Sequence, residues 1–286
     1  MLVKSLLFLF NLLGRKSAIF LGQLLGRLAY YLFVEDRKTT LKNLKFALGD
    51  RLDKKRIKKN SFEVFENIGK NAVDIFRLKK FSWKKIKNIV ETEGLDYFDQ
   101  VYKKGKGLIA LTGHIGNFEL LAAYLSLRGY KLSVVGRVAY DPKLNKLLVK
   151  NREKMGLENI SSTEDIRKMI SSLQKGRVLG ILADQDSKKV KGVYVDFFGK
   201  KAKTPLGPAL LHLKYGFPIV PLAILRMGRY GYKIIVKKPI VFTPTGEKEK
   251  DLVQITQLYT EELEKIIREN PSEWVWMHKR WRSQPT

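Results

Sequence analysis

The sequence predicts an α/β fold in which a mostly parallel central sheet is flanked by helices, with an N-terminal helical segment that associates with a membrane. Between about residues 89 and 182, short apolar runs alternate with segments whose apolar residues recur at helical spacing, and this alternation is typical of a parallel sheet covered by helices. Several apolar runs end in polar residues, which would place polar side chains at the carboxyl edge of the sheet. Residues 1–34 are apolar but interrupted by basic residues, a pattern of membrane-interface helices.

The chain has the length and composition of one large folded domain with a short anchoring segment. Its 286 residues are 44% hydrophobic, enough for a core in an α/β domain over residues 35–286, with residues 1–34 as the anchor. Lysine and arginine number 55 against 28 acidic residues, and the resulting net charge of +27 predicts an anionic partner. Anionic lipid headgroups, an acidic protein and nucleic acid are the candidates. The lack of cysteine excludes disulfides and thiolate metal sites.

The N-terminal segment predicts helices that lie in the membrane interface. Its longest uncharged run, residues 5–14, is too short to cross a bilayer, which needs about 20 residues. The next apolar run, residues 17–34, is interrupted by Gln23 and Arg27. A spanning helix over residues 17–34 and a helical pair packed in the protein core are the alternatives.

Residues 35–88 are predicted to form a basic helical subregion in front of the sheet. Lysine and arginine cluster in residues 51–59 and 84–87, while Phe65 and Val73 belong to an apolar helix face. Such charge runs are most often solvated helix surface, and together they favour adhesion to an anionic membrane. No RNA- or DNA-binding motif accompanies the charge, so no nucleic-acid partner is expected.

The sheet and its helices are predicted next along the chain. Strands are expected at 88–93, 108–111, 131–135 and 178–182, and helices at 94–103, 118–127, 142–155 and 164–174. A later helix is expected to start at Thr204 and Pro205, with Thr204 as its cap and Pro205 as its first residue. The free amides of that helix start, beside three lysines, predict a phosphate site.

The turn after the strand at 108–111 carries the ionisable residues that point to chemistry. Gly113 and Gly116 allow a tight turn, and Asn117 is suited to accept from the free amides of the following helix. His114 lies in this turn and Glu119 follows five positions later. On one continuous helix they would be rotated by about 140° from each other, but across a glycine turn they can meet. A carboxylate bonded to one ring nitrogen orients the imidazole and makes the other nitrogen a better proton acceptor.

A histidine base without a protein nucleophile predicts direct acyl transfer to a substrate hydroxyl. The chain has no cysteine and no Gly-x-Ser-x-Gly elbow, so the base would activate a hydroxyl of the substrate and form no covalent enzyme intermediate. From composition alone, a structural His–Glu pair is the alternative interpretation. A lipid hydrolase, which would use water as the acceptor, is another.

Further polar residues at strand ends and in the C-terminal segment complete the candidates. Asp184 and Gln185 follow the last predicted strand. His212 lies among leucines and is expected to be a packing residue. His278 has only Glu273 as a carboxylate nearby in the sequence, so it is a poor candidate for the base. Three histidines without metal-ligand spacing predict no metal site.

The turn from His114 to Glu119 resembles the His-x-x-x-x-Asp/Glu signature of the lysophospholipid acyltransferase superfamily, in the form typical of bacterial lipid A late (lauroyl/myristoyl) acyltransferases. Other blocks resemble that family in the same order along the chain. They are Arg137 with Asn151-Arg152, Asp184-Gln185, the segment from Phe197 to Thr204, Val220-Pro221, and the segment from Trp274 to Trp281. The resemblance therefore extends over roughly residues 1–285.

The resemblance implies a membrane-associated O-acyltransferase on the cytoplasmic face of the bacterial inner membrane. It would move a fatty acyl group from an acyl-carrier-protein thioester to a hydroxyl of a lipid A precursor, with His114 as general base, Glu119 as its orienting residue and no bound cofactor. Arg137 or backbone amides of the glycine turn are expected to stabilise the oxyanion. The residues expected to contribute to substrate binding are Asn117, Arg152, Asp184, Gln185 and Thr204.

The donor and the acceptor are less narrowly defined by the resemblance. Acyl-carrier protein is acidic and would be attracted to the positive surface, and acyl-CoA, also anionic, is the alternative donor. Close relatives acylate other glycolipids, including mannosylated phosphatidylinositols, so a different glycolipid or a lysophospholipid is the alternative acceptor. A non-catalytic basic protein that binds membranes is the hypothesis from another class.

Overall fold

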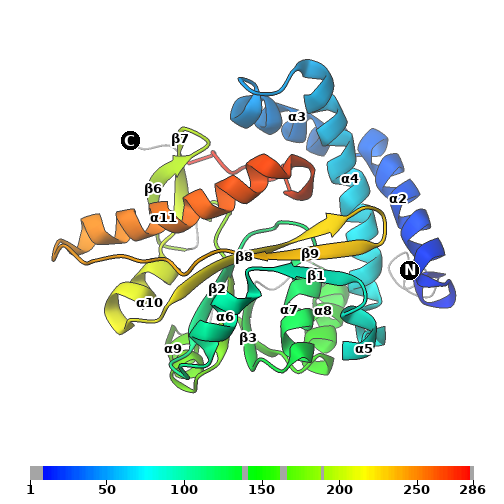
Figure 1. The fold of residues 1–286 in the computed structure, drawn as a ribbon. Coiled ribbons are helices and arrows are strands. Elements are labelled where there is room, and N and C mark those ends of the chain that lie inside the picture. The colour runs from blue at the N-terminus through cyan, green and yellow to red at the C-terminus, as the bar shows by residue number, and fades with distance from the viewer. Residues whose placement is uncertain (1–8, 137–140, 162–165, 188–189, 284–286) are drawn as a thin grey trace.

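The computed structural model describes residues 9–136, 141–161, 166–187 and 190–283. A seven-stranded sheet forms its centre (Figure 1). The strands of this sheet are β1 (Val90–Glu93), β2 (Leu108–Thr112), β3 (Leu132–Gly136), β4 (Glu158–Ser161), β5 (Val178–Leu182), β8 (Ile219–Met227) and β9 (Gly231–Val236).

The sheet has the strand order β1-β9-β8-β2-β5-β3-β4. Neighbouring strands are parallel, apart from the antiparallel pair β8 and β9. The prediction of an α/β fold with a mostly parallel sheet flanked by helices is therefore confirmed. Each of the four predicted strands is present, with its ends within two residues of the predicted bounds.

Helices cover both faces of the sheet (Figure 1). They are α6 (Leu95–Tyr102), α7 (Phe118–Arg128), α8 (Pro142–Lys154), α9 (Ile166–Gln174), α10 (Gly207–Tyr215) and α11 (Lys248–Glu269). In β2, Leu108 and Ala110 enter the hydrophobic core shared with α6 and α7, whereas Ile109 and Leu111 enter the core shared with α10 and α11. Because both faces of β2 are buried, this strand is a continuous apolar run rather than an alternating one.

The N-terminal region is helical, as predicted, and packs beside the sheet (Figure 1). It contains α2 (Arg15–Leu32), α3 (Val34–Leu48), α4 (Lys54–Phe76), η1 (Leu78–Lys80) and α5 (Trp83–Ile86). Helices α2 and α4 cross at glycines: a Cβ atom on Gly69 would lie 2.1 Å from the carbonyl oxygen of Gly22. Arg15 also binds Asp74 with two hydrogen bonds of 2.9 Å, which ties the start of α2 to the end of α4.

None of the individual helices in the described part of the chain has both the length and the apolar character needed to cross a bilayer. Helices α2 and α3 meet that requirement only as a pair, and they are bent by 90° relative to each other.

The segment from 192 to 205 forms a β-hairpin that the sequence did not predict. Its strands are β6 (Gly192–Phe197) and β7 (Lys200–Pro205), and Thr204 pairs with Val193. The predicted helix start at Thr204 and Pro205 is therefore wrong, because strand pairing takes up both residues. Helix α10 begins at Gly207 after Leu206 and has no side-chain cap.

Candidate active site

The glycine turn between β2 and α7 brings its backbone close to other parts of the fold. Gly116 has a φ of +57°, and a Cβ atom there would lie 1.7 Å from the carbonyl oxygen of Ile224. At Gly113 a Cβ atom would lie 2.9 Å from the Cγ atom of Asp184. These close approaches explain why glycine occupies both positions.

His114 in this turn is paired with Asp184, which follows β5. Strands β2 and β5 are parallel neighbours with Thr112 opposite Leu182, so the residues two positions beyond each strand meet at the same sheet edge. The Nδ1 atom of His114 lies 2.9 Å from Oδ1 of Asp184. The carboxylate is fully buried, whereas 29% of the histidine side chain is exposed. The buried carboxylate of Asp184 therefore holds one side of the imidazole, and the other side remains accessible to solvent.

Asp184 is a buried carboxylate surrounded by hydrogen-bond donors. Its Oδ2 atom accepts from the backbone amide of His114 at 2.8 Å and from Nε1 of Trp274 at 2.7 Å. Burial alone would raise the pKa of Asp184, but the charge and hydrogen bond of His114, together with His278 and Trp274, hold this pKa well below its usual range. Because an ionised carboxylate only accepts, Nδ1 of His114 is the donor, which leaves the lone pair on Nε2.

Glu119 binds Arg152 and not His114, which corrects the predicted His114–Glu119 pair. Nε of Arg152 donates to Oε2 of Glu119 at 2.9 Å, and Nη2 donates to Oε1. Both side chains are largely buried. Burial opposes the charge of Arg152, but the bond and charge of Glu119 raise the pKa of Arg152. The physical reason is that α7 begins at Phe118, so Glu119 is already helical and faces α8.

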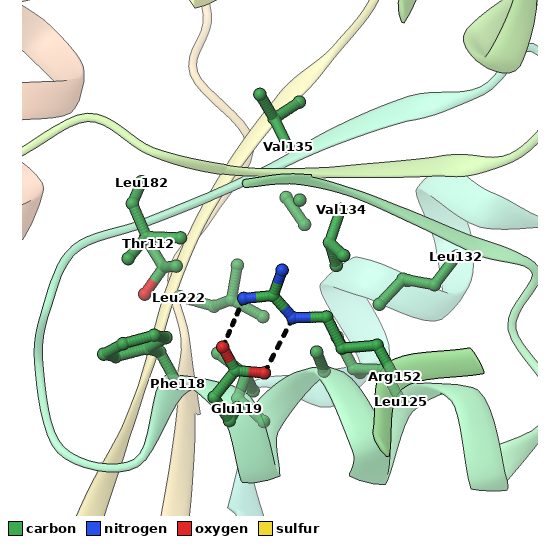
Figure 2. A pocket seen from close by; sticks show the side chains of 14 residues that line it. Thr112, Phe118, Glu119, Leu125, Leu132, Val134, Val135, Arg152, Leu182 and Leu222 are labelled. Carbon is green, nitrogen blue, oxygen red and sulfur yellow. Dashed lines mark hydrogen bonds and ion pairs between the residues drawn. The ribbon is translucent and has the colours of Figure 1, made fainter. Parts of the chain in front are cut away.

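A cavity of about 50 Å³ lies beside this ion pair (Figure 2). The ion pair, the hydroxyl of Thr112 and Phe118 contribute to its wall, and the remainder of the lining is apolar. The apolar lining residues are Ala110, Leu121, Ala122, Leu125, Leu132, Val134, Val135, Gly180, Leu182 and Leu222. The cavity therefore lies between the sheet and α7, and Thr112 and Phe118 in its wall flank the turn that carries His114.

The C-terminal segment clamps the glycine turn from the other side. Ile115 and Trp274 form an antiparallel bridge. The amide of Gly116 donates to the carbonyl of Glu273 at 2.7 Å, and the amide of Val275 donates to the carbonyl of His114 at 3.2 Å. The sequence indicated this contact with the glycine turn only through the many tryptophans of the segment, because the paired residues lie about 160 positions apart.

Two backbone amides of the turn are already occupied, which narrows the predicted oxyanion site. The amide of His114 donates to Asp184, and that of Gly116 donates to Glu273. Neither is available to an oxyanion. The other predicted oxyanion residue, Arg137, lies outside the described residues.

Asn117 and Thr204 are buried and bind other parts of the protein. The Oδ1 atom of Asn117 accepts from the amide of Leu120 at 3.1 Å, which confirms the predicted helix cap, and its Nδ2 atom donates to the hydroxyl of Tyr232. The hydroxyl of Thr204 accepts from Nη2 of Arg280 at 2.5 Å. Both residues are therefore placed to support the site rather than to contact a substrate.

The remaining predicted residues differ in their surroundings. Gln185 is half-buried in the loop after Asp184. His212 donates from Nδ1 to the carbonyl of Phe217 at 2.8 Å, which agrees with the packing role predicted for it. His278 lies near Asp184, whose charge acts on it, although the sequence offered only Glu273 as a neighbouring carboxylate.

The sequence of the chain is similar to those of known acyltransferases. The sequence model described as bacterial lipid A biosynthesis acyltransferase matches residues 1–283. A phosphatidylinositol mannoside acyltransferase of Mycobacterium tuberculosis (strain CDC 1551 / Oshkosh) is 25% identical over 223 residues, which cover 76% of this chain and 68% of the relative. The lipid A biosynthesis lauroyltransferase of Escherichia coli (strain K12) is 24% identical over 268 residues, covering 93% of this chain and 85% of the relative. The lipid A biosynthesis palmitoleoyltransferase of the same strain is 22% identical over 271 residues, with the same coverage.

Proposed function

The chain belongs to the bacterial lipid A biosynthesis acyltransferase family, and we propose that it transfers a fatty acyl group from an acyl-carrier-protein thioester to a hydroxyl of a lipid A precursor. It is an acyltransferase, as the family and the named relatives are. The observation that supports the proposed mechanism best is the contact of His114 with the buried carboxylate of Asp184. The ring of His114 also packs against Phe118, which lines an apolar cavity.

In the proposed reaction, His114 is the general base and Asp184 its orienting residue. Nε2 of His114 takes the proton of the acceptor hydroxyl while the hydroxyl oxygen attacks the thioester carbonyl carbon. The carbon–sulfur bond of the tetrahedral intermediate then breaks, and the leaving sulfur takes the proton from Nε2. The products are an ester and a free carrier thiol. The ionised Asp184 stabilises the imidazolium that forms between the two steps.

Negative charge develops on the thioester oxygen in this reaction and needs a positive partner. The N-terminus of α7, which starts at Phe118 immediately after the glycine turn, supplies helix-end amides with a positive dipole. Arg137 stays a candidate for the same role.

We assign the cavity beside the Glu119–Arg152 pair to part of the fatty acyl chain, because its volume of about 50 Å³ accommodates only a short stretch of methylene groups. Its lining is mostly apolar, and it begins close to the turn that carries His114. The ion pair joins α7 to α8 across this wall (Figure 2), so we propose that Glu119 and Arg152 maintain the shape of the acyl site.

We propose that the enzyme works on the cytoplasmic face of the bacterial inner membrane. Helix α2 exposes apolar side chains at a spacing of four, namely Phe20, Leu24, Leu28 and Leu32, and this stripe would enter the membrane interface. The net charge of +27 favours both anionic lipid and the acidic carrier protein, and acyl-CoA is the alternative donor.

A phosphatidylinositol mannoside is the alternative acceptor. The mycobacterial relatives that carry this activity in their names are about as similar to the chain as the lipid A enzymes are. The catalytic pair would be unchanged in either case, because both reactions add an acyl group to a hydroxyl of a glycolipid.

Mass spectrometry of lipid products tests the proposal. The purified protein and its His114→Ala variant would be incubated with an acyl-carrier-protein thioester and either a lipid A precursor or a phosphatidylinositol mannoside. A gain of one acyl mass on the lipid A precursor, lost in the variant, is expected. A gain of one acyl mass only on the phosphatidylinositol mannoside would identify that lipid as the acceptor. No gain on any glycolipid, with membrane binding intact, would favour a non-catalytic binding protein.

A further inference from the structure

A second pocket, of about 390 Å³, lies where the start of α2 meets the chain between α4 and β1, close to α5 (Figure 1). Four of the residues that line it are basic, namely Arg15, Arg77, Lys80 and Lys85, and none of the lining residues is acidic. No residue of the proposed catalytic pair belongs to its wall. Such a concentration of one charge in a concave site favours an anionic ligand.

Arg77 is the buried basic residue of this pocket, with 8% of its surface exposed. Its Nη1 atom donates to the carbonyls of Phe10 and of Leu13, the latter at 2.8 Å. Its Nε and Nη2 atoms have no hydrogen-bond partner among the described residues, and they are not sealed from solvent. Arg15 binds the carboxylate of Asp74 through these same two atoms. The corresponding edge of Arg77 therefore offers a fork of two donors that suits phosphate oxygens.

The positive charges in the pocket are only partly neutralised by the protein. Arg15 is already paired with Asp74. Burial lowers the pKa of Arg77, and Asp74 only partly opposes this shift. Burial and then the charge of Arg77 lower the pKa of Lys80, and no carboxylate among the described residues opposes that shift. A bound anion would relieve this repulsion.

Exposed apolar side chains lie beside the pocket. Leu12 is 71% exposed, and the carbonyls of both its neighbours in the chain accept from pocket residues, Arg77 and Lys80. Helix α2 then starts at Arg15 and carries the exposed apolar stripe from Phe20 onwards. A phosphate in the pocket would thus have apolar surface next to it for hydrocarbon chains. This arrangement favours the phosphate of a lipid over free phosphate.

We propose that this basic pocket binds the phosphate of an anionic phospholipid headgroup and holds the N-terminal helices at one position on the membrane surface. Phosphate oxygens would accept from Nε and Nη2 of Arg77, with the exposed Lys80 and Lys85 at the mouth of the pocket. The inference does not rest on the proposed acyl transfer, because its test measures binding and needs no turnover.

The test compares the wild type with two double variants of the full chain. Lys80→Gln with Lys85→Gln changes the pocket, whereas the matched control, Lys79→Gln with Lys84→Gln, removes the same charge from exposed positions of the same segment that do not line it. Binding would be measured by co-sedimentation with phosphatidylcholine vesicles that contain phosphatidylglycerol and no glycolipid. General attraction to the anionic surface weakens equally in both variants. The pocket variant should bind about tenfold more weakly than the control, the loss expected for one charge-assisted hydrogen bond.

A third variant tests the buried arginine without a change of charge. Arg77→Lys keeps the positive charge but loses the two-donor fork, so it should also weaken vesicle binding. Thermal unfolding of each variant shows whether the fold is kept. The lysine variants are exposed and should unfold close to the wild-type temperature, so they test the inference even if Arg77→Lys is unstable.

Calorimetric titration with inorganic phosphate at constant ionic strength distinguishes the two sources of phosphate. Heat of binding that the pocket variant loses, together with equal vesicle binding by the two double variants, would assign the pocket to free phosphate and overturn the headgroup assignment. Equal vesicle binding by the two double variants, with no heat from inorganic phosphate, would leave only general electrostatic attraction and overturn the inference as a whole.

Discussion

Replacing Asp184 by asparagine should reverse the tautomer of His114 while changing the protein little elsewhere. The two donors at Oδ2, the amide of His114 and the indole of Trp274, can still be satisfied by the asparagine oxygen. The asparagine NH₂ group then takes the place of Oδ1, 2.9 Å from Nδ1 of His114. Because NH₂ is a donor, Nδ1 has to become the acceptor, and the proton moves to Nε2.

The expected size of the effect follows from the loss of the base. An imidazole protonated on Nε2 cannot accept the proton of the acceptor hydroxyl, and the equivalent change in a serine protease triad lowers kcat by about 10⁴. We expect kcat to fall by about 10³- to 10⁴-fold, which corresponds to about 4–5.5 kcal/mol in the barrier.

Steady-state acyl transfer by Asp184→Asn, His114→Ala and the double variant measures this effect. Since Asp184 acts through His114, the double variant should be no slower than His114→Ala alone. Circular dichroism would show that the fold is kept. A loss of less than tenfold in Asp184→Asn, or losses that multiply in the double variant, would refute the orienting role.

Three further predictions follow from the contacts around the site. Arg152→Met leaves Glu119 buried and unpaired, so the free energy of unfolding in urea should fall by about 3–5 kcal/mol, and Glu119→Leu added to it should recover most of that loss; no recovery would contradict the ion-pair account. The pKa of His278 falls from 6.5 to about 4 on folding, so the unfolded chain binds more protons than the folded chain between these pH values. The free energy of unfolding should therefore drop by about 2 kcal/mol from pH 7.5 to pH 5, and by less in His278→Phe. An equal drop in the wild type and in His278→Phe, measured by urea unfolding at the two pH values, would contradict this prediction. Val134→Phe narrows the cavity and should shift product chains to shorter lengths in a mixed-donor competition read by mass spectrometry, whereas Val241→Phe, at a position 86% exposed, should not; the same product mixture from both would remove the cavity from the acyl site.

The sheet could be predicted because its strands are local patterns. Strands such as β5 are short apolar runs between helical segments, and both faces of the sheet are buried, so their sequence is unambiguous. The β6–β7 hairpin was missed because Lys200 to Thr204 carries three lysines and gives no strand pattern. Its pairing depends on β6 packing against α11, which no local pattern reports.

The site could be predicted only in part. His114 was identifiable because its glycine turn is a local feature at a strand end. Its partner was not, because Asp184 lies 70 positions away and becomes adjacent only through the pairing of β2 with β5. Glu119 was closer in sequence, but its place in the first turn of α7 directs it to Arg152. Proximity in the sequence therefore suggested Glu119 as the partner of His114, whereas the structure pairs His114 with Asp184.

The tautomer of His114 is the property on which the proposed chemistry depends, and ¹⁵N NMR of the full chain labelled at histidine measures it directly. The sequence contains three histidines, so loss of one signal in His114→Ala assigns the resonance. We predict that the neutral ring of His114 carries its proton on Nδ1 and the lone pair on Nε2. A proton on Nε2 in the wild type would contradict the account, since that ring could not act as the base.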